Sequence, residues 1–168
     1  GAEVVLRDGF DAERTRADIT RFAIRHASLV PTMLHRLLVL ETPPVATSAL
    51  ASCCFLVGGA ALSGELARRA TKAGVDVRAT YGMTEAASQV TTTERGEVVE
   101  YPETAGRALD GVSVRIEAPD REGYGEIVVS GGTLCHGDYE DTESTRAALR
   151  GGELFTGDPD WSKLMSAK

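Results

Sequence analysis

Residues 52–80 read SCCFLVGGAALSGELARRATKAGVDVRAT and carry the clearest structural pattern of the chain. The apolar run at residues 52–57 is typical of a buried strand, and two glycines close it. Residues 63–73 then read as a helix that stops at Gly74, and residues 75–80 read as another strand. Strands that alternate with helices in this way predict a parallel sheet.

The alternation continues toward the N-terminus. Asp11 is placed to cap a helix that extends to about Arg25, and residues 27–30 read as a short buried strand. Pro31 suits the first turn of the next helix, and residues 42–48 read as a proline-containing loop. The first half of the chain therefore predicts layers of helices against one sheet.

Beyond about residue 98 the pattern changes to short strands separated by glycine and proline. Strands are expected at residues 112–117, 125–130 and 154–156, and a short helix at residues 141–149. We predict an α/β fold in which a parallel sheet with flanking helices is followed by a smaller β-rich subdomain. The predicted parts are residues 1–97 for the α/β part, 98–158 for the β-rich subdomain and 159–168 for a C-terminal tail.

Composition excludes several classes of function. The chain has 168 residues and a net charge of -7, and its basic residues are scattered, so we expect no nucleic-acid partner. Three cysteines, of which Cys53 and Cys54 are adjacent, argue against a disulfide framework and against a zinc site. No apolar run is long enough to span a bilayer and the N-terminus carries no secretion signal, so we expect a cytoplasmic protein.

Two segments at the ends of predicted strands contain residues that could bind a ligand or take part in a reaction. Residues 56–63 (LVGGAALS) lie between a strand and a helix, and open parallel sheets bind ligands at the carboxyl ends of their strands. Residues 80–89 (TYGMTEAASQ) combine an aromatic ring, a hydroxyl and a carboxylate, which suit a base, a phosphate and Mg²⁺ respectively. The structural alternatives are a tight strand-to-helix turn for the first segment and a helix start capped by Thr84 for the second.

Two shorter motifs lie in the second half of the chain. Residues 125–131 (GEIVVSG) read as a glycine-bounded strand. Residues 155–158 (FTGD) place Asp158 after a Thr-Gly turn, where its carboxylate can accept hydrogen bonds from the two hydroxyls of a ribose. The structural alternative for this motif is an Asx turn.

These four segments, in this order, resemble four core motifs of the adenylate-forming superfamily of AMP-binding enzymes, which includes the acyl-CoA synthetases. The resemblance extends from about Gly1 to Asp158. Within the superfamily, residues 28–34 (SLVPTML) and 80–92 most resemble the o-succinylbenzoate–CoA ligases of menaquinone biosynthesis. The resemblance implies an ATP- and Mg²⁺-dependent ligase that converts a carboxylic acid to an acyl-adenylate and then to a coenzyme A thioester.

The resemblance also implies a role for individual residues, of which Thr84 and Glu85 are the expected catalytic ones. In this reading Gly58, Gly59 and Ala60 line the adenine site, Tyr81 flanks the adenine with Gly82 allowing close approach, Thr84 contacts the α-phosphate, Glu85 holds Mg²⁺, Asp158 binds the ribose hydroxyls, and Ser88 and Gln89 begin the acyl pocket.

Two parts of the family pattern are not found in the sequence. A phosphate loop rich in Ser, Thr and Gly and ending in lysine is expected well upstream of residue 58, and a lid domain with another lysine is expected downstream. None of the three lysines, Lys72, Lys163 and Lys168, lies in a sequence context that matches either part. The sequence PDWSKL after Asp158 also departs from the family pattern. We therefore expect an internal fragment that is inactive alone. The alternatives are another acyl-CoA synthetase, for a fatty or aryl acid, and a non-catalytic binding remnant of the fold.

Overall fold

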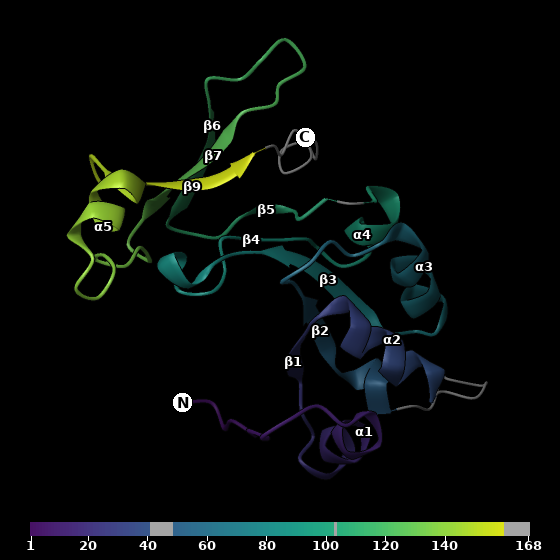
Figure 1. The fold of residues 1–168 in the computed structure, drawn as a ribbon. Helices are drawn as coiled ribbons and strands as arrows, with labels where there is room; N and C mark the ends of the chain where they lie inside the picture. The colour runs from purple at the N-terminus through teal and green to yellow at the C-terminus, as the bar shows by residue number, and fades with distance from the viewer. Residues whose placement is uncertain (41–48, 103, 160–168) are drawn as a thin grey trace.

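The computed structural model describes residues 1–40, 49–102 and 104–159, which form two sheets with helices packed beside each (Figure 1). The predicted loop at residues 42–48 and most of the predicted tail lie outside the described residues. Within these ranges, no helix has both the length and the apolar character that crossing a membrane requires. The helices are α1 (Ala12–Arg21), α2 (Pro31–Val39), α3 (Gly64–Lys72), α4 (Glu97–Glu100) and α5 (Thr142–Ala148), with the 3-10 helices η2 (Ala49–Ser52) and η3 (Thr84–Ala86). The strands are β1 (His26–Leu29), β2 (Cys54–Val57), β3 (Asp76–Tyr81), β4 (Thr91–Thr92), β5 (Arg107–Ala108), β6 (Val112–Glu117), β7 (Glu126–Gly131), β8 (Leu149–Arg150) and β9 (Glu153–Pro159).

The first sheet has the strand order β1-β2-β3-β4-β5. β1, β2 and β3 are parallel, with Leu29 beside Val57 and Val57 beside Ala79, which confirms the three parallel strands predicted from the sequence. β4 and β5 join in antiparallel orientation, so the sheet is mixed rather than wholly parallel. Neither of these strands was predicted, because a strand of two residues is too short to show a periodic pattern.

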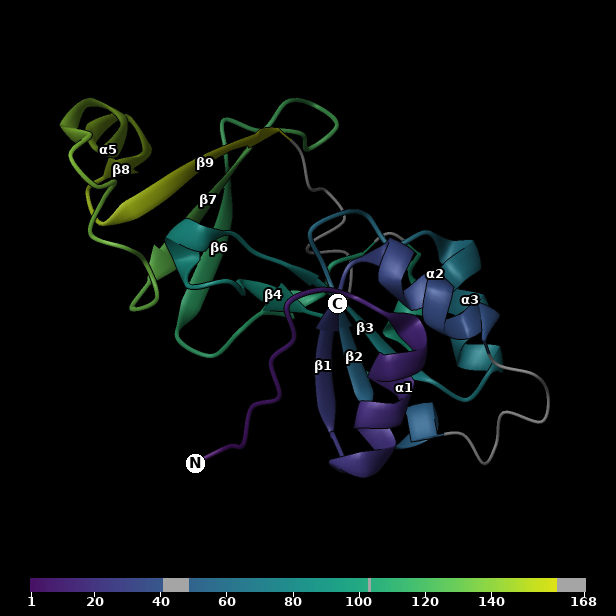
Figure 2. The same cartoon turned by 60° about the horizontal axis from the view of Figure 1, so that its bottom comes forward.

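Helices cover one face of this sheet. α1, α2 and α3 lie on the same side of β1, β2 and β3 (Figure 2). Alternate side chains of β2 and β3 point into this layer, so Phe55, Val57, Val77 and Ala79 are buried. The helices contribute Ile19, Leu34, Leu37, Leu38, Ala67 and Ala70 to the same core.

Side-chain caps begin α1 and α3, and the cap of α1 was expected from the sequence. The carboxylate of Asp11 accepts a hydrogen bond from the backbone N–H of Arg14 at 2.7 Å, and Ser63 caps α3 in the same way. α1 ends at Arg21, earlier than the predicted Arg25. The helix cannot continue because Ala23 has a left-handed backbone conformation, with φ of 50°.

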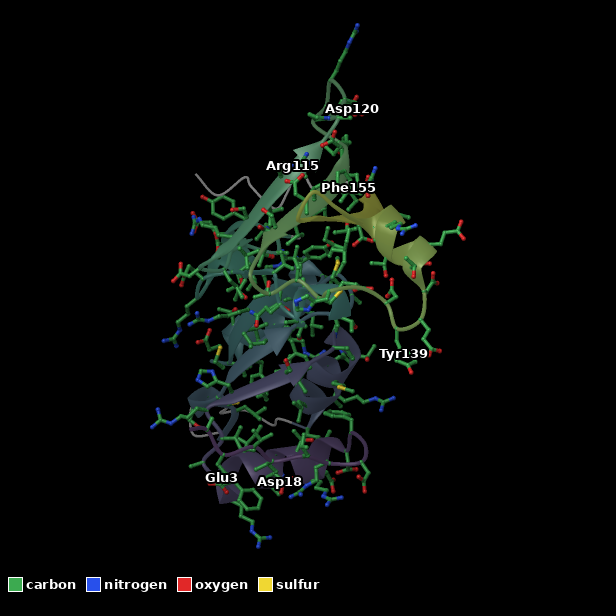
Figure 3. The ribbon with its side chains drawn as sticks, turned by 90° about the vertical axis from the view of Figure 1, so that its left-hand side faces the viewer. Glu3, Asp18, Arg115, Asp120, Tyr139 and Phe155 are labelled. Atoms are coloured by element: carbon green, nitrogen blue, oxygen red, sulfur yellow. The ribbon has the colours of Figure 1, made fainter. Side chains whose placement is uncertain are left out.

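The second sheet is antiparallel, with the strand order β6-β7-β9-β8. Its inner face buries Ile127, Val129 and Leu154. On its outer face, the guanidinium carbon of Arg115 lies 5.7 Å from the centre of the Phe155 ring (Figure 3). The expected change from an α/β layer to a β-rich part is confirmed, and β9 is longer than the predicted strand at residues 154–156.

A second hydrophobic core, separate from the one beneath the helices, lies between the second sheet and loops that connect strands of the first sheet. Ala86, Val90 and Ala105, from segments that follow the first-sheet strands, pack with the inner face of the second sheet. Because of this packing, the loop after β3 lies against the second sheet. The domain boundary expected near residues 97 and 98 stays a prediction, although the first sheet itself continues beyond it to β5.

Candidate functional site

A cavity of about 270 Å³ lies where β2 and β3 end. Because these strands are parallel, their carboxyl ends meet at one edge of the sheet, where ligand crevices form in open α/β sheets. The turn at residues 58–60 and the start of the segment at residues 81–85 therefore lie at the same edge of the sheet. The volume lies just below the roughly 300–1,000 Å³ that is typical of small-molecule sites. The lining residues are Val57, Gly59, Ala60, Ala61, Leu62, Ala79, Thr80, Tyr81, Gly82, Thr104, Ala105 and Asp158.

The turn after β2 is shaped by the neighbouring strands. The backbone N–H of Gly58 donates to the carbonyl of Leu29 at 3.1 Å. A Cβ atom at position 58 would overlap the hydroxyl of Thr80 and crowd its carbonyl oxygen, so a larger residue here would displace the adjacent strand residue. Gly59 has a φ of 73°, in the region that favours glycine. Gly59 and Ala60 line the cavity, whereas Gly58 does not.

The loop after β3 folds back closely on itself. The backbone N–H of Val90 donates to the carbonyl of Tyr81 at 2.8 Å and closes the loop. A Cβ atom on Gly82 would overlap the carbonyl oxygen of Ser88, so the loop can close only over a glycine. Ala87 and Ser88 have φ values of 53° and 84°, which are unfavourable for residues other than glycine. Strained backbone of this kind clusters at functional sites.

Thr84 and Glu85 lie on η3 and do not line the cavity. Thr84 is exposed, and η3 follows Met83 without any side-chain capping bond, so Thr84 does not cap a helix as the structural alternative expects. Glu85 is half-buried, and its carbonyl accepts a hydrogen bond from the backbone N–H of Cys135 at 2.7 Å. This bond ties the turn that carries Glu85 to the segment following β7.

Ser88 and Gln89 do not line the cavity either. Ser88 is exposed, and the side-chain amide of Gln89 donates to the hydroxyl of Thr92 on β4. Both residues lie at the end of the loop that carries Glu85. Their predicted place at the beginning of an acyl pocket stays a prediction.

Asp158 reaches the cavity from the second sheet. It lies near the end of β9, where the pairing with β7 shifts register between Glu126 and Val128. The hydroxyl of Tyr81 donates to Oδ2 of Asp158 at 2.8 Å. Two residues that the sequence placed at the adenine and at the ribose therefore meet at one cavity, although 77 positions separate them along the chain.

The electrostatics of the cavity favour a neutral ring system. Burial, followed by the hydrogen bond to Asp158, raises the pKa of Tyr81, because the phenolate would lose water and face a carboxylate. Among the described residues that line the cavity, Asp158 is the only charged one. Small apolar residues line the cavity together with hydroxyl side chains and one acceptor carboxylate, a set that can receive an uncharged ring and a sugar hydroxyl.

Thr104 and Ala105 also line the cavity and were not predicted. The Thr104 hydroxyl accepts a hydrogen bond from the backbone N–H of Gly106 at 3.1 Å. Gly106 has a φ of 81°, and a Cβ atom there would overlap the backbone of Thr92. Thr104 and Ala105 are small residues followed by a glycine, and this pattern is the sequence signal that could have identified this wall of the cavity.

The donor set fits Mg²⁺ only together with phosphate. The described residues contain no group of three or more His, Cys, Asp or Glu side chains that could hold a metal by themselves. In phosphate-binding sites, Mg²⁺ usually takes one or two carboxylates and completes its shell with phosphate and water oxygens. Glu85 offers one carboxylate on the turn that follows Gly82, which matches this type of site.

Comparison with known proteins places the chain in a family. A family model described as AMP-binding enzyme matches residues 1–139. The chain belongs to the AMP-binding enzyme family. The 2-succinylbenzoate–CoA ligase of Bacillus pumilus (strain SAFR-032) is 36% identical to this chain over 163 residues. The match covers 94% of this chain and 32% of the relative.

Solved structures of family members agree with this membership. The unliganded o-succinylbenzoate coenzyme A synthetase (MenE) of Bacillus subtilis gives a TM-score of 0.81 at 28% identity, over 91% of this chain and 34% of that chain. The same enzyme in complex with ATP and magnesium ion gives a TM-score of 0.77 at 28% identity, over 89% and 32%. The family predicted from the motifs is confirmed by the family model, and the chain spans about a third of the length of these relatives.

The raised pKa of Tyr81 predicts an alkaline loss of stability. In the unfolded chain this phenol ionises near its ordinary pKa of about 10, whereas in the folded chain it stays protonated to higher pH. Its contribution to the free energy of unfolding is therefore complete below about pH 10 and is lost as the pH rises through the folded pKa.

Urea unfolding from pH 9 to 12 measures this effect. Tyr81→Phe should lose less of its free energy of unfolding over this range than the native chain does. Tyr124→Phe, at a partly exposed position, is the control. The same alkaline loss in Tyr81→Phe as in the native chain would contradict this prediction.

Proposed function

We propose that this chain is the nucleotide-binding part of an adenylate-forming acid–CoA ligase that acts on o-succinylbenzoate. The observation that carries the proposal is the cavity at the carboxyl ends of β2 and β3, where Tyr81 and Asp158 meet. The named activity of the Bacillus pumilus relative, which aligns with 94% of this chain, supports the choice of acid. The Bacillus subtilis complex with ATP and magnesium ion supports the choice of nucleotide and metal.

The proposed reaction has two steps. A carboxylate oxygen of the acid attacks the α-phosphorus of ATP, the bond to pyrophosphate breaks, and an acyl-adenylate forms. The sulfur of coenzyme A then attacks the acyl carbon, AMP leaves, and the thiol proton passes to solvent. Negative charge accumulates around the α-phosphate in both steps. The protein therefore contributes mainly by positioning the reactants and by electrostatic stabilisation.

The proposed roles follow the positions of the residues. The turn at residues 58–60 and the ring of Tyr81 enclose the adenine, and Asp158 accepts from the ribose hydroxyls. The exposed hydroxyl of Thr84 donates to the α-phosphate. Glu85 holds Mg²⁺, which neutralises charge on the phosphates as pyrophosphate leaves. The cytoplasmic setting stays a prediction.

Binding of adenylates tests this function and its substrate. Calorimetry should compare AMP with non-hydrolysable adenylate analogues that carry an o-succinylbenzoyl or a long-chain fatty acyl group. If Ser88 and Gln89 begin the acyl pocket, the o-succinylbenzoyl analogue should bind at least about tenfold more tightly than AMP and than the fatty acyl analogue. Equal binding of the two acyl analogues would favour another acyl-CoA synthetase. Absence of any adenylate binding would favour a non-catalytic remnant of the fold.

By itself, the chain should fail to form acyl-adenylate at the rate of a complete ligase. The described residues that line the cavity include no lysine or arginine to meet the charge that develops on the phosphates. Loss of a single preorganised donor lowers kcat by about 10²–10³ in a well-studied hydrolase. Exchange of labelled pyrophosphate into ATP with o-succinylbenzoate should therefore be slower than in the Bacillus subtilis enzyme by a factor of at least about 10². Exchange at the rate of that enzyme would contradict the prediction.

A further inference from the structure

The hydrogen bond between Tyr81 and Asp158 connects the two sheets across the cavity. Tyr81 is the last residue of β3, and Asp158 lies on β9. The O···O distance is 2.8 Å, which is short enough for a strong hydrogen bond to a carboxylate. A tyrosine phenol has an ordinary pKa of about 10 and is therefore protonated at neutral pH. The Tyr81 phenol is the donor of this bond, and Oδ2 of Asp158 is the acceptor.

The pairing of β9 with β7 is irregular between Phe155 and Pro159, the stretch that contains Asp158. The ladder pairs Val128 with Phe155 and then Glu126 with Pro159, so β9 contains extra residues in this stretch. Bulges next to active sites commonly redirect a side chain out of the regular alternation of a strand. Here the bulge places the Asp158 carboxylate at the cavity and within reach of β3.

Local hydrogen bonds fix this bulge. The hydroxyl of Thr156 donates to the carbonyl of Ile127 at 2.9 Å and accepts from the backbone N–H of Asp158 at 3.1 Å. Gly157 adopts a left-handed φ of 71°, which the bulge requires. With the backbone held in this way, the remaining freedom of Asp158 is the rotation of its side chain. The hydroxyl of Tyr81 restricts that rotation.

We propose that Tyr81 is a positioning residue for ribose recognition. Its hydroxyl holds Oδ2 of Asp158, so that the other carboxylate oxygen is presented to a ribose hydroxyl of the bound nucleotide. This inference rests on the proposed function and adds a second task to the Tyr81 side chain. The ring faces the adenine, whereas the hydroxyl orients the residue that reads the sugar. A phenylalanine would preserve the first task and lose the second.

The test is calorimetric binding of two nucleotides, AMP and 2′,3′-dideoxy-AMP, which lacks both ribose hydroxyls. Tyr81→Phe should weaken AMP binding about five- to tenfold, because one charge-assisted hydrogen bond that orients the acceptor is lost. It should weaken dideoxy-AMP binding by less than about twofold, since that ligand makes no bond to Asp158. Asp158→Asn should give the same pattern, and the double variant should bind AMP no more weakly than Asp158→Asn alone. Tyr124→Phe serves as a matched control and should bind both nucleotides as the native chain does.

Several results would overturn the inference, and they can be told apart. Equal weakening for both nucleotides in Tyr81→Phe would mean that the hydroxyl merely supports the fold, and the proposed function would stand. Tighter AMP binding by Tyr81→Phe would mean that the phenol competes with the ribose for Asp158. If the native chain binds neither nucleotide, the proposed function fails before any variant is compared, and this inference fails with it.

Discussion

Gly82→Ala should lower the free energy of unfolding by about 2–3 kcal/mol, which is the upper part of the range for overpacked sites. The added Cβ atom would overlap the carbonyl oxygen of Ser88, and the neighbour is backbone rather than a flexible side chain. The loop can make room only by moving Ser88 away, and Ala87 and Ser88 already have unfavourable φ values. Since Val90 closes the same loop onto Tyr81, the displacement should also weaken AMP binding. Urea unfolding without nucleotide measures the loss of stability.

Gly132→Ala is the matched control for this change. An added Cβ atom at position 132 meets nothing within 4 Å, and the backbone there needs no positive φ. Its stability should stay within about 0.5 kcal/mol of the native value, as for other surface substitutions. If Gly82→Ala kept the native stability and lost only AMP binding, the glycine would serve the close approach of adenine, as the family resemblance implies. Closure of the loop after β3 would then not depend on glycine at position 82.

Glu85→Gln should abolish most of the effect of Mg²⁺ on ATP binding. The amide keeps the size and shape of the side chain but removes the charge that a hard cation prefers. The Mg²⁺-dependent gain in ATP affinity should fall by at least the roughly 10–100-fold that loss of an outer-shell partner costs at metal sites. Thr84→Val should weaken ATP binding with and without Mg²⁺, because it removes a phosphate donor and retains the volume. Titration of ATP over a range of Mg²⁺ concentrations measures both effects.

The control for Glu85→Gln is Glu143→Gln. Glu143 lies in the first turn of α5, just as Glu85 lies in the first turn of η3, so both changes remove a carboxylate from a helix start. Glu143→Gln should leave the Mg²⁺ dependence unchanged. Thermal melting without nucleotide should be similar for the two variants. An unchanged Mg²⁺ dependence in Glu85→Gln would remove the metal assignment from this residue.

The layered part of the fold was predictable because its signals are local. The apolar run at residues 52–57, the capping residue Ser63 and the glycine after α3 each specify an element on their own, and their order specifies parallel pairing. The pairing of β4 and β5 has no such signal. These strands hold two residues each, and their place in the sheet depends on tertiary contacts such as the close approach of Gly106 to Thr92.

The candidate site also has a part that local sequence signals predict and a part that depends on the whole structure. Gly59, Ala60 and Gly82 line the cavity just beyond the ends of strands, and Tyr81 lines it as the last residue of β3. Their positions were predictable from the order of strands and glycines. The contact between Tyr81 and Asp158 was not predictable from either motif alone. It depends on the bulge in β9 and on how the second sheet packs against the first, which are properties of the whole structure.

Chemical-shift mapping of AMP on the isotopically labelled chain would show whether the cavity at the ends of β2 and β3 holds an adenylate. The backbone amides of Gly59, Ala60, Gly82 and Ala105 should shift on titration with AMP. Amides on the outer face of the second sheet, such as that of Arg115, should stay unchanged. Saturable shifts confined to the cavity residues are the result that we predict. Shifts that cluster elsewhere, or no shifts at millimolar AMP, would contradict the assignment of this cavity as the nucleotide site.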